Sequence, residues 1–371
     1  MTGDDQRLLD AVAENHCAWF RRTSETLGLP VVSQQGGELC VNRRGAMIFL
    51  RGSADPGRLL EEVRAHQLGS VGCWSLDAGL ELARTLLPWG FEWGWRPHWM
   101  AYGLDTDRVT ENRDGARAAA DSRTFTVQHA AGPYANTLPY APDGPEPPEA
   151  VRLGVRLREK IVGSVVVYPL QAVAGIYSMG VVQKVRRRGI GSALVNAALD
   201  AARQAGCSHA VLNATDQGAL CYGACGFRTL GYGQTWWWSP RPQPSLRQHR
   251  LAEAVAAGEL ERLSELKPDP DELSSALPCG ETPLVLALLT GQPGVGEYLL
   301  RLRPALAQVR YPPYDATLLH LAVMHDRPEF LELALSFGTD PLVRDQTFGA
   351  TALGWAEHLE RAWLAQRLRI S

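Results

Sequence analysis

A run of basic and glycine residues in the middle of the chain has the composition of an anion-binding turn. Residues 177–194 read YSMGVVQKVRRRGIGSAL. An apolar strand from Tyr177 to Val182 leads into a basic turn, and a helix is expected to begin near Gly189. The first N–H groups of a helix lack intrahelical partners and carry partial positive charge, so they attract phosphate groups. Glycines let the backbone approach closely, and arginines add bidentate donors. The segment therefore predicts a site for a pyrophosphate.

Two motifs here resemble the GNAT acetyltransferase superfamily. The turn lacks the G-x-G-x-x-G and G-K-[ST] patterns of Rossmann and P-loop proteins. Instead, Arg186, Gly189 and Gly191 match [R/Q]-x-x-G-x-[G/A], motif A of that family. Residues 215–227, TDQGALCYGACGF, resemble motif B, whose mark is a tyrosine shortly before Gly-Phe; Tyr222 stands at that place. The resemblance implies a mixed strand–helix–strand–helix lobe.

The resemblance also implies how acetyl-CoA would bind. In the family, the strand before the turn separates from its neighbour, and its backbone binds the pantetheine arm. The cofactor-binding residues expected here are Met179, Gly180, Val181, Arg186, Arg187, Arg188, Gly189, Ile190, Gly191, Ser192 and Asn213. Met179 and Val181 can also belong to the sheet core, because their backbone makes the contact.

The reaction implied is attack of an acceptor amine on the thioester of acetyl-CoA. The departing CoA thiolate needs a proton, which a phenol can supply. Motif B makes Tyr222 the expected catalytic residue, a general acid, with packing of its helix on the sheet as the alternative. A lysine-like amine has a pKa of about 10.4 and must lose a proton. His129, Glu159 and Asp216 lie near the motifs, but structural roles explain each better, so the general base stays unassigned.

The composition is that of a globular protein with more than one domain. A chain of 371 residues is long enough for two or three domains. The net charge of −3 argues against broad binding to nucleic acid or membranes. No apolar run is long enough to span a membrane, and the N-terminus lacks the pattern of a signal peptide. We therefore expect a soluble, cytoplasmic protein.

Cysteine usage agrees with that expectation. The seven cysteines include no C-x-x-C pair, which indicates free thiols in a reducing compartment. Cys221 and Cys225 stand one helical turn apart. No second pair of ligands at suitable spacing accompanies them, so no metal site is expected.

The first hundred residues have the same α/β order as the motif-bearing region. Gly90-Phe91 matches Gly226-Phe227, and aromatic-rich strands follow both. No R-x-x-G-x-G follows the corresponding strand, however, so residues 1–105 are interpreted as a degenerate GNAT-like lobe that arose by duplication. The expected helices cover 5–27, 56–66 and 77–87, and the expected strands cover 38–42, 46–51, 70–75, 92–95 and 98–104.

The acceptor side departs from the family pattern. Residues 131–149 are dense in proline and glycine, where GNAT lobes normally have helices. A loop, or the first lobe, must then bound the acceptor site. Tryptophans at 93, 95, 99 and 236–238 could form a cage for a cationic acceptor, although burial between strands explains them better.

The C-terminal third is helical and repetitive. TPLVLALLTGQ, TLLHLAVMHDR and TALGWAEHLER begin at Thr282, Thr317 and Thr351, and a degenerate copy begins near His249. The spacing of about 33–35 residues and the T-P-L-H-x-A pattern resemble ankyrin repeats. Such a stack buries its core through neighbouring repeats. Binding of a protein partner and bracing of the enzyme remain equal alternatives.

Together these patterns predict tandem α/β GNAT-like lobes with mixed central sheets, followed by an all-α ankyrin-repeat domain. The expected boundaries are 1–105 for the degenerate lobe, 106–124 for a linker, 125–240 for the acetyltransferase lobe and 247–371 for the repeats. The expected function is acetyl-CoA-dependent N-acetyl transfer to a primary amine of a small molecule or protein. The alternative is a non-catalytic acyl-CoA-binding or scaffold protein. The sequence leaves open the acceptor, the acyl preference and the oligomeric state.

Overall fold

The computed structural model describes residues 3–34, 36–50, 55–76, 79–104, 125–240 and 245–370. It contains two compact units. The α/β unit comprises Met1–Ala78 and Gly94–Thr235, and the helical unit comprises Gly79–Trp93 and Trp236–Ser371. Residues 79–93, which the sequence assigns to the first lobe, thus group with the C-terminal segment. The expected linker, 106–124, lies outside the described residues.

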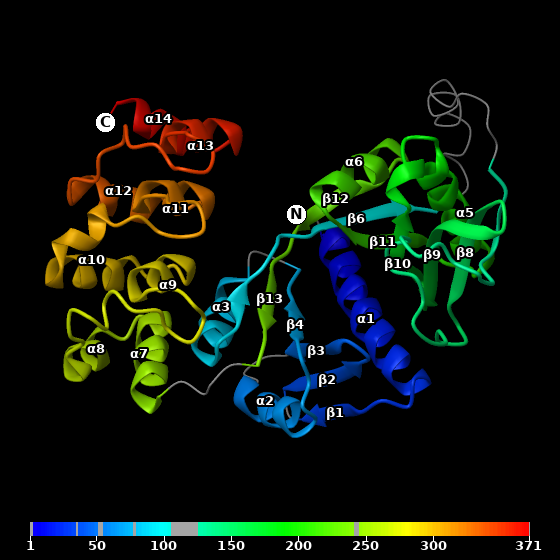
Figure 1. The fold of residues 1–371 in the computed structure, drawn as a ribbon, viewed down its shortest axis with the longest axis horizontal. Helices are drawn as coiled ribbons and strands as arrows, with labels where there is room; N and C mark the ends of the chain where they lie inside the picture. The colour runs from blue at the N-terminus through cyan, green and yellow to red at the C-terminus, as the bar shows by residue number, and fades with distance from the viewer. Residues whose placement is uncertain are drawn as a thin grey trace. The chain divides into compact units, whose positions relative to one another are not determined.

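The larger sheet of the α/β unit has seven strands in the order β12-β6-β11-β10-β9-β8-β7. Their bounds are β6 (His98–Gly103), β7 (Val127–His129), β8 (Val151–Leu157), β9 (Lys160–Leu170), β10 (Val173–Val181), β11 (His209–Ala214) and β12 (Arg228–Tyr232). Strand β6 comes from the first lobe, residues 1–105, yet it pairs antiparallel with both β11 and β12. Figure 1 shows β6 crossing to this sheet. A strand of the first lobe therefore completes the sheet of the second.

Helices cover both faces of this sheet. Helices α5 (Ile190–Gln204) and α6 (Asp216–Ala224) follow β10 and β11, and α5 buries one apolar stripe that includes Leu194 and Ala198. Helix α1 (Gly3–Thr26) covers the other face, where Leu8 and Val12 pack with Trp99, Val173 and Val211. Alternate strand residues point to opposite faces, so β10 and β11 supply both cores.

The first lobe repeats the element order of the second. It contains β1 (Val31–Gln34), β2 (Gly37–Asn42), β3 (Gly45–Leu50), α2 (Pro56–Ala65) and β4 (Val71–Trp74). Strands β2 and β3 form an antiparallel hairpin, α2 follows, and β4 returns parallel to β3. Strands β9, β10 and β11 with α5 have the same arrangement. The repetition is consistent with internal duplication, which stays a prediction.

The end of the second lobe returns to the first within the α/β unit. The Ser75 N–H donates to the Gln234 carbonyl over 2.9 Å, and the Thr235 N–H donates to the Trp95 carbonyl over 3.1 Å. The Trp99 indole also donates to the Ser75 carbonyl over 3.0 Å. The two lobes are therefore bound together by chain segments that extend from each into the other.

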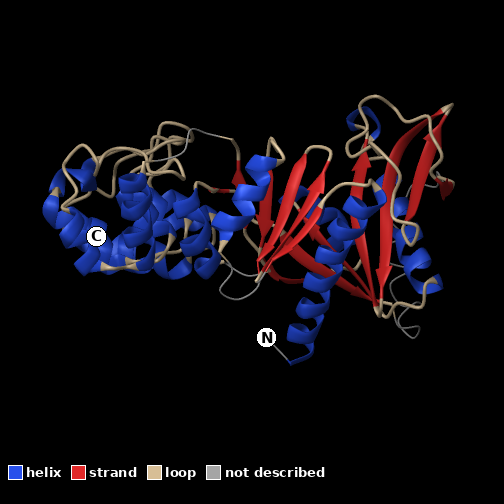
Figure 2. Cartoon of the chain, turned by 90° about the horizontal axis from the view of Figure 1, so that it is seen from below, coloured by secondary structure: helices blue, strands red, loops and turns tan. Residues whose placement is uncertain are grey.

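The helical unit is built mainly from successive helix pairs, which Figure 2 draws as helices joined by loops. Their bounds are α7 (Leu246–Ala257), α8 (Leu260–Leu266), α9 (Pro283–Leu289), α10 (Pro293–Leu302), α11 (Leu318–Met324), α12 (Pro328–Ser336), α13 (Ala352–His358) and α14 (Ala362–Arg369). The unit also holds α3 (Leu80–Leu86), the 3₁₀ turns η1 (Leu87–Trp89) and η4 (Pro304–Gln308), and the paired strands β5 (Glu92–Trp93) and β13 (Thr235–Trp238).

Recurring contacts hold the pairs in register. Thr317 and Thr351, which begin two of the repeats in the sequence, are N-caps of α11 and α13. Just before α10, Gln292 Nε2 donates to the Ala256 carbonyl of the preceding pair over 2.9 Å. At the equivalent place before α12, Arg327 Nε donates to the Leu288 carbonyl over 3.1 Å. The helical C-terminal region is confirmed, while its identity as ankyrin repeats stays a prediction.

The tryptophans mostly fill cores. Trp99 and Trp236 are among the largest fully buried side chains. Trp93 and Trp236 meet edge to face with ring centroids 6.1 Å apart. Packing, rather than a cage, therefore explains these three. Within the described ranges, no helix combines the length and apolar character needed to cross a membrane.

Candidate cofactor site

Strand β10 separates from β11 halfway along its length. Their parallel pairing covers only Val173–Gly175 with His209–Val211. In the same register Tyr177 would face Asn213, but the described strands form no pair there. A bulge also interrupts the pairing of β10 with β9, and Ser178 within it has a φ of 49°. The backbone of β10 beyond the bulge is therefore left with an unpaired edge toward β11, as the sequence motifs predict.

The turn after β10 presents unpaired N–H groups. The 3₁₀ turn η3 (Gln183–Val185) leads to Gly189, the N-cap of α5, whose φ of 84° favours glycine. The first hydrogen bond of α5 runs from the Ala193 N–H to the Gly189 carbonyl over 3.0 Å. Among the described residues, no partner is found for the N–H groups of residues 187–192. Arg186 Nε donates to the Val181 carbonyl over 3.0 Å and holds the turn against the strand.

The side chains of Arg186, Arg187 and Arg188 are exposed around this turn. Their charges add to the partial positive charge of the helix start. The turn thus combines unpaired N–H groups with positive charge, the two features that a pyrophosphate site needs.

Tyr222 lies beside the separated strand. Thr215 caps α6 by accepting from the Gly218 N–H over 3.2 Å, and this sets the helix that carries Tyr222. The Tyr222 hydroxyl donates to Met179 Sδ over 3.1 Å. Burial raises the pKa of Tyr222 well above its usual value, because a buried phenolate is poorly solvated. The phenol therefore keeps its proton at neutral pH and is available as a donor.

A loop bounds the site on the side of Gly180. A Cβ added at Gly180 would lie only 2.5 Å from the Pro139 carbonyl oxygen, so the glycine is needed for this loop to pass. Arg152 Nη1 donates to the Tyr140 carbonyl over 3.3 Å, and Nη2 of the same side chain pairs with Glu146. Tyr140 itself is 60% exposed. The sequence leaves either a loop or the first lobe as the boundary of the acceptor side. In the structure, the loop with Pro139 and Tyr140 lies next to Gly180.

Helix α1 holds β10 from the opposite face. The Tyr177 hydroxyl donates to Asn15 Oδ1 over 2.7 Å, and Tyr177 stacks on Trp19 with centroids 4.7 Å apart. Asn15 Nδ2 lies 3.2 Å from the Val173 carbonyl. A Cβ at Gly175 would lie 2.2 Å from Asn15 Oδ1, so a glycine is required there as well. The first lobe thus fixes the strand on which the site is built.

Next to Asn15, His16 is buried in an aromatic box. Its ring meets those of Phe20, Phe49, Trp74, Trp99 and Tyr177 at centroid distances of 5.1 to 6.0 Å. Neither ring nitrogen has a hydrogen-bond partner among the described residues. Burial lowers the pKa of His16 to about 3, so the ring is neutral at physiological pH.

A comparison with protein families identifies the region that carries this geometry. Residues 119–227 match the model of the Acetyltransferase (GNAT) family. The match includes β10, the turn before α5 and Tyr222, and it ends at Phe227. The match therefore identifies a GNAT acetyltransferase domain within the chain, and the mixed sheet of the α/β unit has a GNAT-like fold.

The similar solved structures share little sequence with this chain. One similar structure is described as a GCN5-related N-acetyltransferase from Kribbella flavida, with 18% identity, a TM-score of 0.42, and coverage of 63% of this chain and 96% of that one. Another is described as a functionally unknown conserved protein from Staphylococcus epidermidis, with 12% identity, a TM-score of 0.37, and coverage of 57% and 93%. None of the curated proteins matches the sequence.

The GNAT domain brings together some of the expected residues and separates others. Met179, Gly191 and Tyr222 converge, and Cys221, which the sequence did not assign to the site, lies with them. Asn213 shares a strand face with Val211, on the α1 side, whereas Leu212 belongs to the core under α5. Asn213 can thus border the strand gap, but it lies away from Tyr222.

None of the three acid–base residues near the motifs is placed as a general base. His129 lies on β7, the strand at the far edge of the sheet, and Glu159 is exposed in the turn between β8 and β9. Asp216 Oδ1 lies 2.6 Å from His98 Nε2, with its side chain 96% exposed. The general base of the GNAT domain stays unassigned. In the described part of the chain, no three His, Cys, Asp or Glu side chains gather as metal ligands would.

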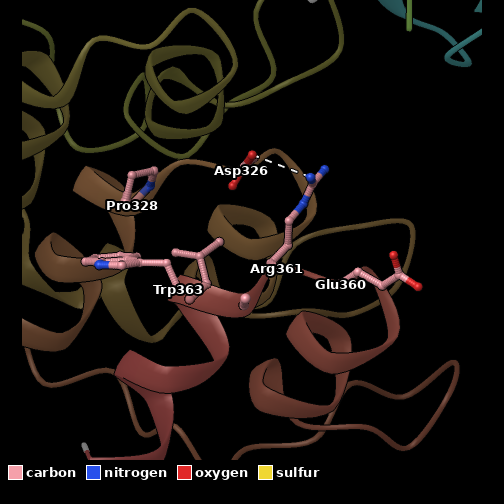
Figure 3. Close-up of a pocket in the computed structure, with 7 residues that line it drawn as sticks. Asp326, Pro328, Glu360, Arg361 and Trp363 are labelled. Carbon is pink, nitrogen blue, oxygen red and sulfur yellow. Dashed lines mark ion pairs between the residues drawn. The ribbon is translucent and has the colours of Figure 1, made fainter. Parts of the chain in front are cut away.

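The helical unit has a hollow of its own, of about 300 Å³. Figure 3 shows Asp326, Pro328, Glu360, Arg361 and Trp363 around it. Arg361 Nη1 lies 3.5 Å from Asp326 Oδ2, and Trp363 is 55% exposed. The lining carries charge and one exposed aromatic ring.

Proposed function

We propose that this protein transfers an acetyl group from acetyl-CoA to a primary amine of a small molecule or protein. The observation that carries the proposal is the unpaired edge of β10 leading into the free N–H groups of residues 187–192, with Tyr222 beside the strand. A scaffold that bound no acyl-CoA would have no need for this combination.

In this proposal, each group has a defined task. The backbone of Met179, Gly180 and Val181 binds the pantetheine arm. The turn from Arg186 to Ser192 binds the pyrophosphate, with Asn213 across the gap. The acceptor amine attacks the thioester carbonyl, the carbon–sulfur bond breaks, and the Tyr222 hydroxyl donates its proton to the departing thiolate. The loop at Pro139 and Tyr140 bounds the acceptor side.

Calorimetric titration of the full chain with acetyl-CoA tests the first half of the proposal. We expect micromolar binding at one site. A panel of amines, including lysine peptides, polyamines and aminoglycosides, is then screened for release of the CoA thiol. Binding without turnover on any amine would favour the non-catalytic acyl-CoA-binding alternative. Absence of binding would refute both.

We further propose that residues 1–105 derive from a GNAT lobe that no longer binds a cofactor. The shared order of hairpin, helix and parallel strand supports a common origin, while the missing R-x-x-G-x-G argues against a second phosphate site. The test is the calorimetric stoichiometry, expected to be one acetyl-CoA per chain. A stoichiometry of two would refute the loss of cofactor binding.

The free state of all seven cysteines supports placing the protein in the cytoplasm.

For the helical unit we propose ankyrin repeats that bind a protein partner. The paired helices, the threonine caps and the hollow beside Trp363 support this. A photo-crosslinking residue at position 363 should capture a defined partner that one at exposed position 302 does not. Capture of the same proteins from both positions would favour the bracing role.

A further inference from the structure

Two thiols of the GNAT domain lie against the proposed pyrophosphate turn. Cys221 is on the last turns of α6, and Cys225 is the C-cap of that helix. Both are half-buried, whereas the other cysteines, Cys17, Cys40, Cys73, Cys207 and Cys279, are buried. A Cβ built at Gly191 would lie 3.4 Å from Cys221 Sγ and 3.7 Å from the Met179 methyl carbon. Cys221 therefore contacts the second residue of α5, at the helix end whose N–H groups are free.

The surroundings favour the thiolate form of Cys221. A hydrogen bond joins Cys225 to Cys221, and the Ser192 hydroxyl is in turn hydrogen-bonded to Cys225. The bond from Cys225 lowers the pKa of Cys221 below its usual value, and the same bond raises the pKa of Cys225. The start of a helix stabilises a thiolate in the same way as it stabilises a phosphate. Because Cys221 is also the thiol that lies against Gly191, it is the candidate nucleophile of this pair, and Cys225 is the candidate donor.

We propose that Cys221 is a thiol-modification site, at which reaction with a low-molecular-weight disulfide blocks the cofactor turn. The thiolate of Cys221 attacks one sulfur of R–S–S–R. A new sulfur–sulfur bond forms between Cys221 and R–S, the old bond breaks, and R–S⁻ leaves and takes a proton from solvent. The group R then occupies the space beside Gly191, and an excess of small thiol reverses the reaction.

The mixed disulfide is expected to persist rather than to pass to Cys225. Residues at positions i and i+4 of a helix have Cβ atoms about 5–6 Å apart. A disulfide needs about 3.5–4.5 Å between Cβ atoms. Attack by Cys225 would therefore require the end of α6 to unwind. Blocking depends on the proposed acetyl-CoA site, but the reactivity of Cys221 does not.

The experiment uses glutathione disulfide on the full-length protein, with the adduct located by fragment-ion mass spectrometry. The variants are Cys221→Ser, Cys225→Ala and Cys225→Ser. We expect one adduct, on Cys221, and none in Cys221→Ser. Because Cys225→Ala removes the hydrogen bond, it should slow the reaction about tenfold near neutral pH. The serine variant keeps a donor and should restore most of the rate. The midpoint of the rate against pH should rise in Cys225→Ala.

Acetyl-CoA titration of the modified protein tests the blocking. We expect the affinity to fall at least about tenfold and to recover after treatment with dithiothreitol. An adduct mainly on Cys225, or equal rates in all cysteine variants, would overturn the site. A full adduct on Cys221 with unchanged acetyl-CoA affinity would overturn the blocking. If the unmodified protein binds no acetyl-CoA, the proposed function fails, and the adduct map still decides whether Cys221 is the reactive thiol.

Discussion

The hydroxyl of Tyr222 lies 3.1 Å from Sδ of Met179, and this contact joins motif B to the strand that precedes motif A. It places the phenol against the strand proposed to bind the pantetheine arm, where the leaving thiolate would form. A hydroxyl bonded to a thioether makes only a weak hydrogen bond, which a substrate sulfur can replace at small cost.

Tyr222→Phe should therefore lower kcat by about 10²–10⁴-fold, as expected for the loss of a general acid. Acetyl-CoA affinity should stay within about twofold, because the ring and its packing on Phe227 remain. The free energy of unfolding should change by less than about 1.5 kcal/mol. Steady-state kinetics, calorimetry and urea unfolding check these three values. Unchanged kcat would leave Tyr222 with a packing role only.

Gly191→Glu should abolish acetyl-CoA binding by placing a carboxylate at the helix start. The fold should tolerate the change, because an added Cβ meets only ordinary contacts at Cys221 and Met179. Gly103→Glu is the matched control, since it adds the same charge at an exposed glycine where a Cβ meets nothing within 4 Å. Calorimetry should show binding in the control alone. Retained binding in Gly191→Glu would place the pyrophosphate elsewhere.

His16 should make the stability of the α/β unit depend on pH. Its pKa is about 3 in the folded protein, against about 6.5 when unfolded. Between these values only the unfolded chain binds the proton, so stability is complete above pH 6.5 and falls by about 1.4 kcal/mol per pH unit below it. From pH 7 to pH 5 the contribution is about 2 kcal/mol.

Urea unfolding at pH 7 and pH 5 measures this difference for the wild type and for His16→Phe. The variant keeps an aromatic ring in the box but cannot titrate, so its loss of stability on acidification should be smaller by that amount. His66→Gln, at an exposed imidazole, is the control. An equal pH dependence in His16→Phe and in the wild type would show that His16 can be protonated in the fold.

Asp345 should be important for the helical unit and irrelevant to the GNAT domain. Its carboxylate accepts from the Phe348 N–H over 2.6 Å, the Ala350 N–H over 3.0 Å and the Trp355 indole over 3.0 Å. Asp345→Ala leaves these donors unpaired, one of them buried, and should cost about 2–4 kcal/mol. Hydrogen exchange over α13 and α14 should rise.

The control for this change is Asp340→Ala, which removes an exposed carboxylate that accepts from the Leu342 N–H over 2.8 Å. Its effect should stay below about 1 kcal/mol. Acetyl-CoA affinity should be the same in both variants. A loss of acetyl-CoA binding in Asp345→Ala would contradict the expectation that Asp345 is irrelevant to the GNAT domain.

The parts of the site that could be predicted from the sequence are those that local chemistry determines. The start of α5 follows from a glycine that adopts a positive φ, and the place of Tyr222 follows from a short helix between Thr215 and Gly226. The element order of the first lobe was predictable for the same reason. Strand β1 was missed because four residues beside proline and glycines give little periodicity.

The remaining features depend on contacts between distant parts of the chain. Asn15 and Tyr177 are far apart in the sequence, and no local pattern indicates that they pair. The need for glycine at position 180 becomes clear only when the loop with Pro139 is seen to pass close to it. In the same way, the position of Cys221 beside Gly191 becomes clear only when α6 has been placed. The order of strands in the seven-stranded sheet could not be predicted either, because the hydrophobic pattern of β6 fits any sheet.

The position of β6 has a consequence for synthesis on the ribosome. This strand emerges first, but both of its neighbours, β11 and β12, follow roughly a hundred residues later, which takes about 5–20 s at ordinary elongation rates. During that time its buried residues Trp99 and Met100 are without the strands that later cover them. A fragment limited to 119–227 would lack the strand permanently and leave an unpaired edge on β11 that promotes aggregation. The boundaries of the family match are thus not those of a unit that folds alone.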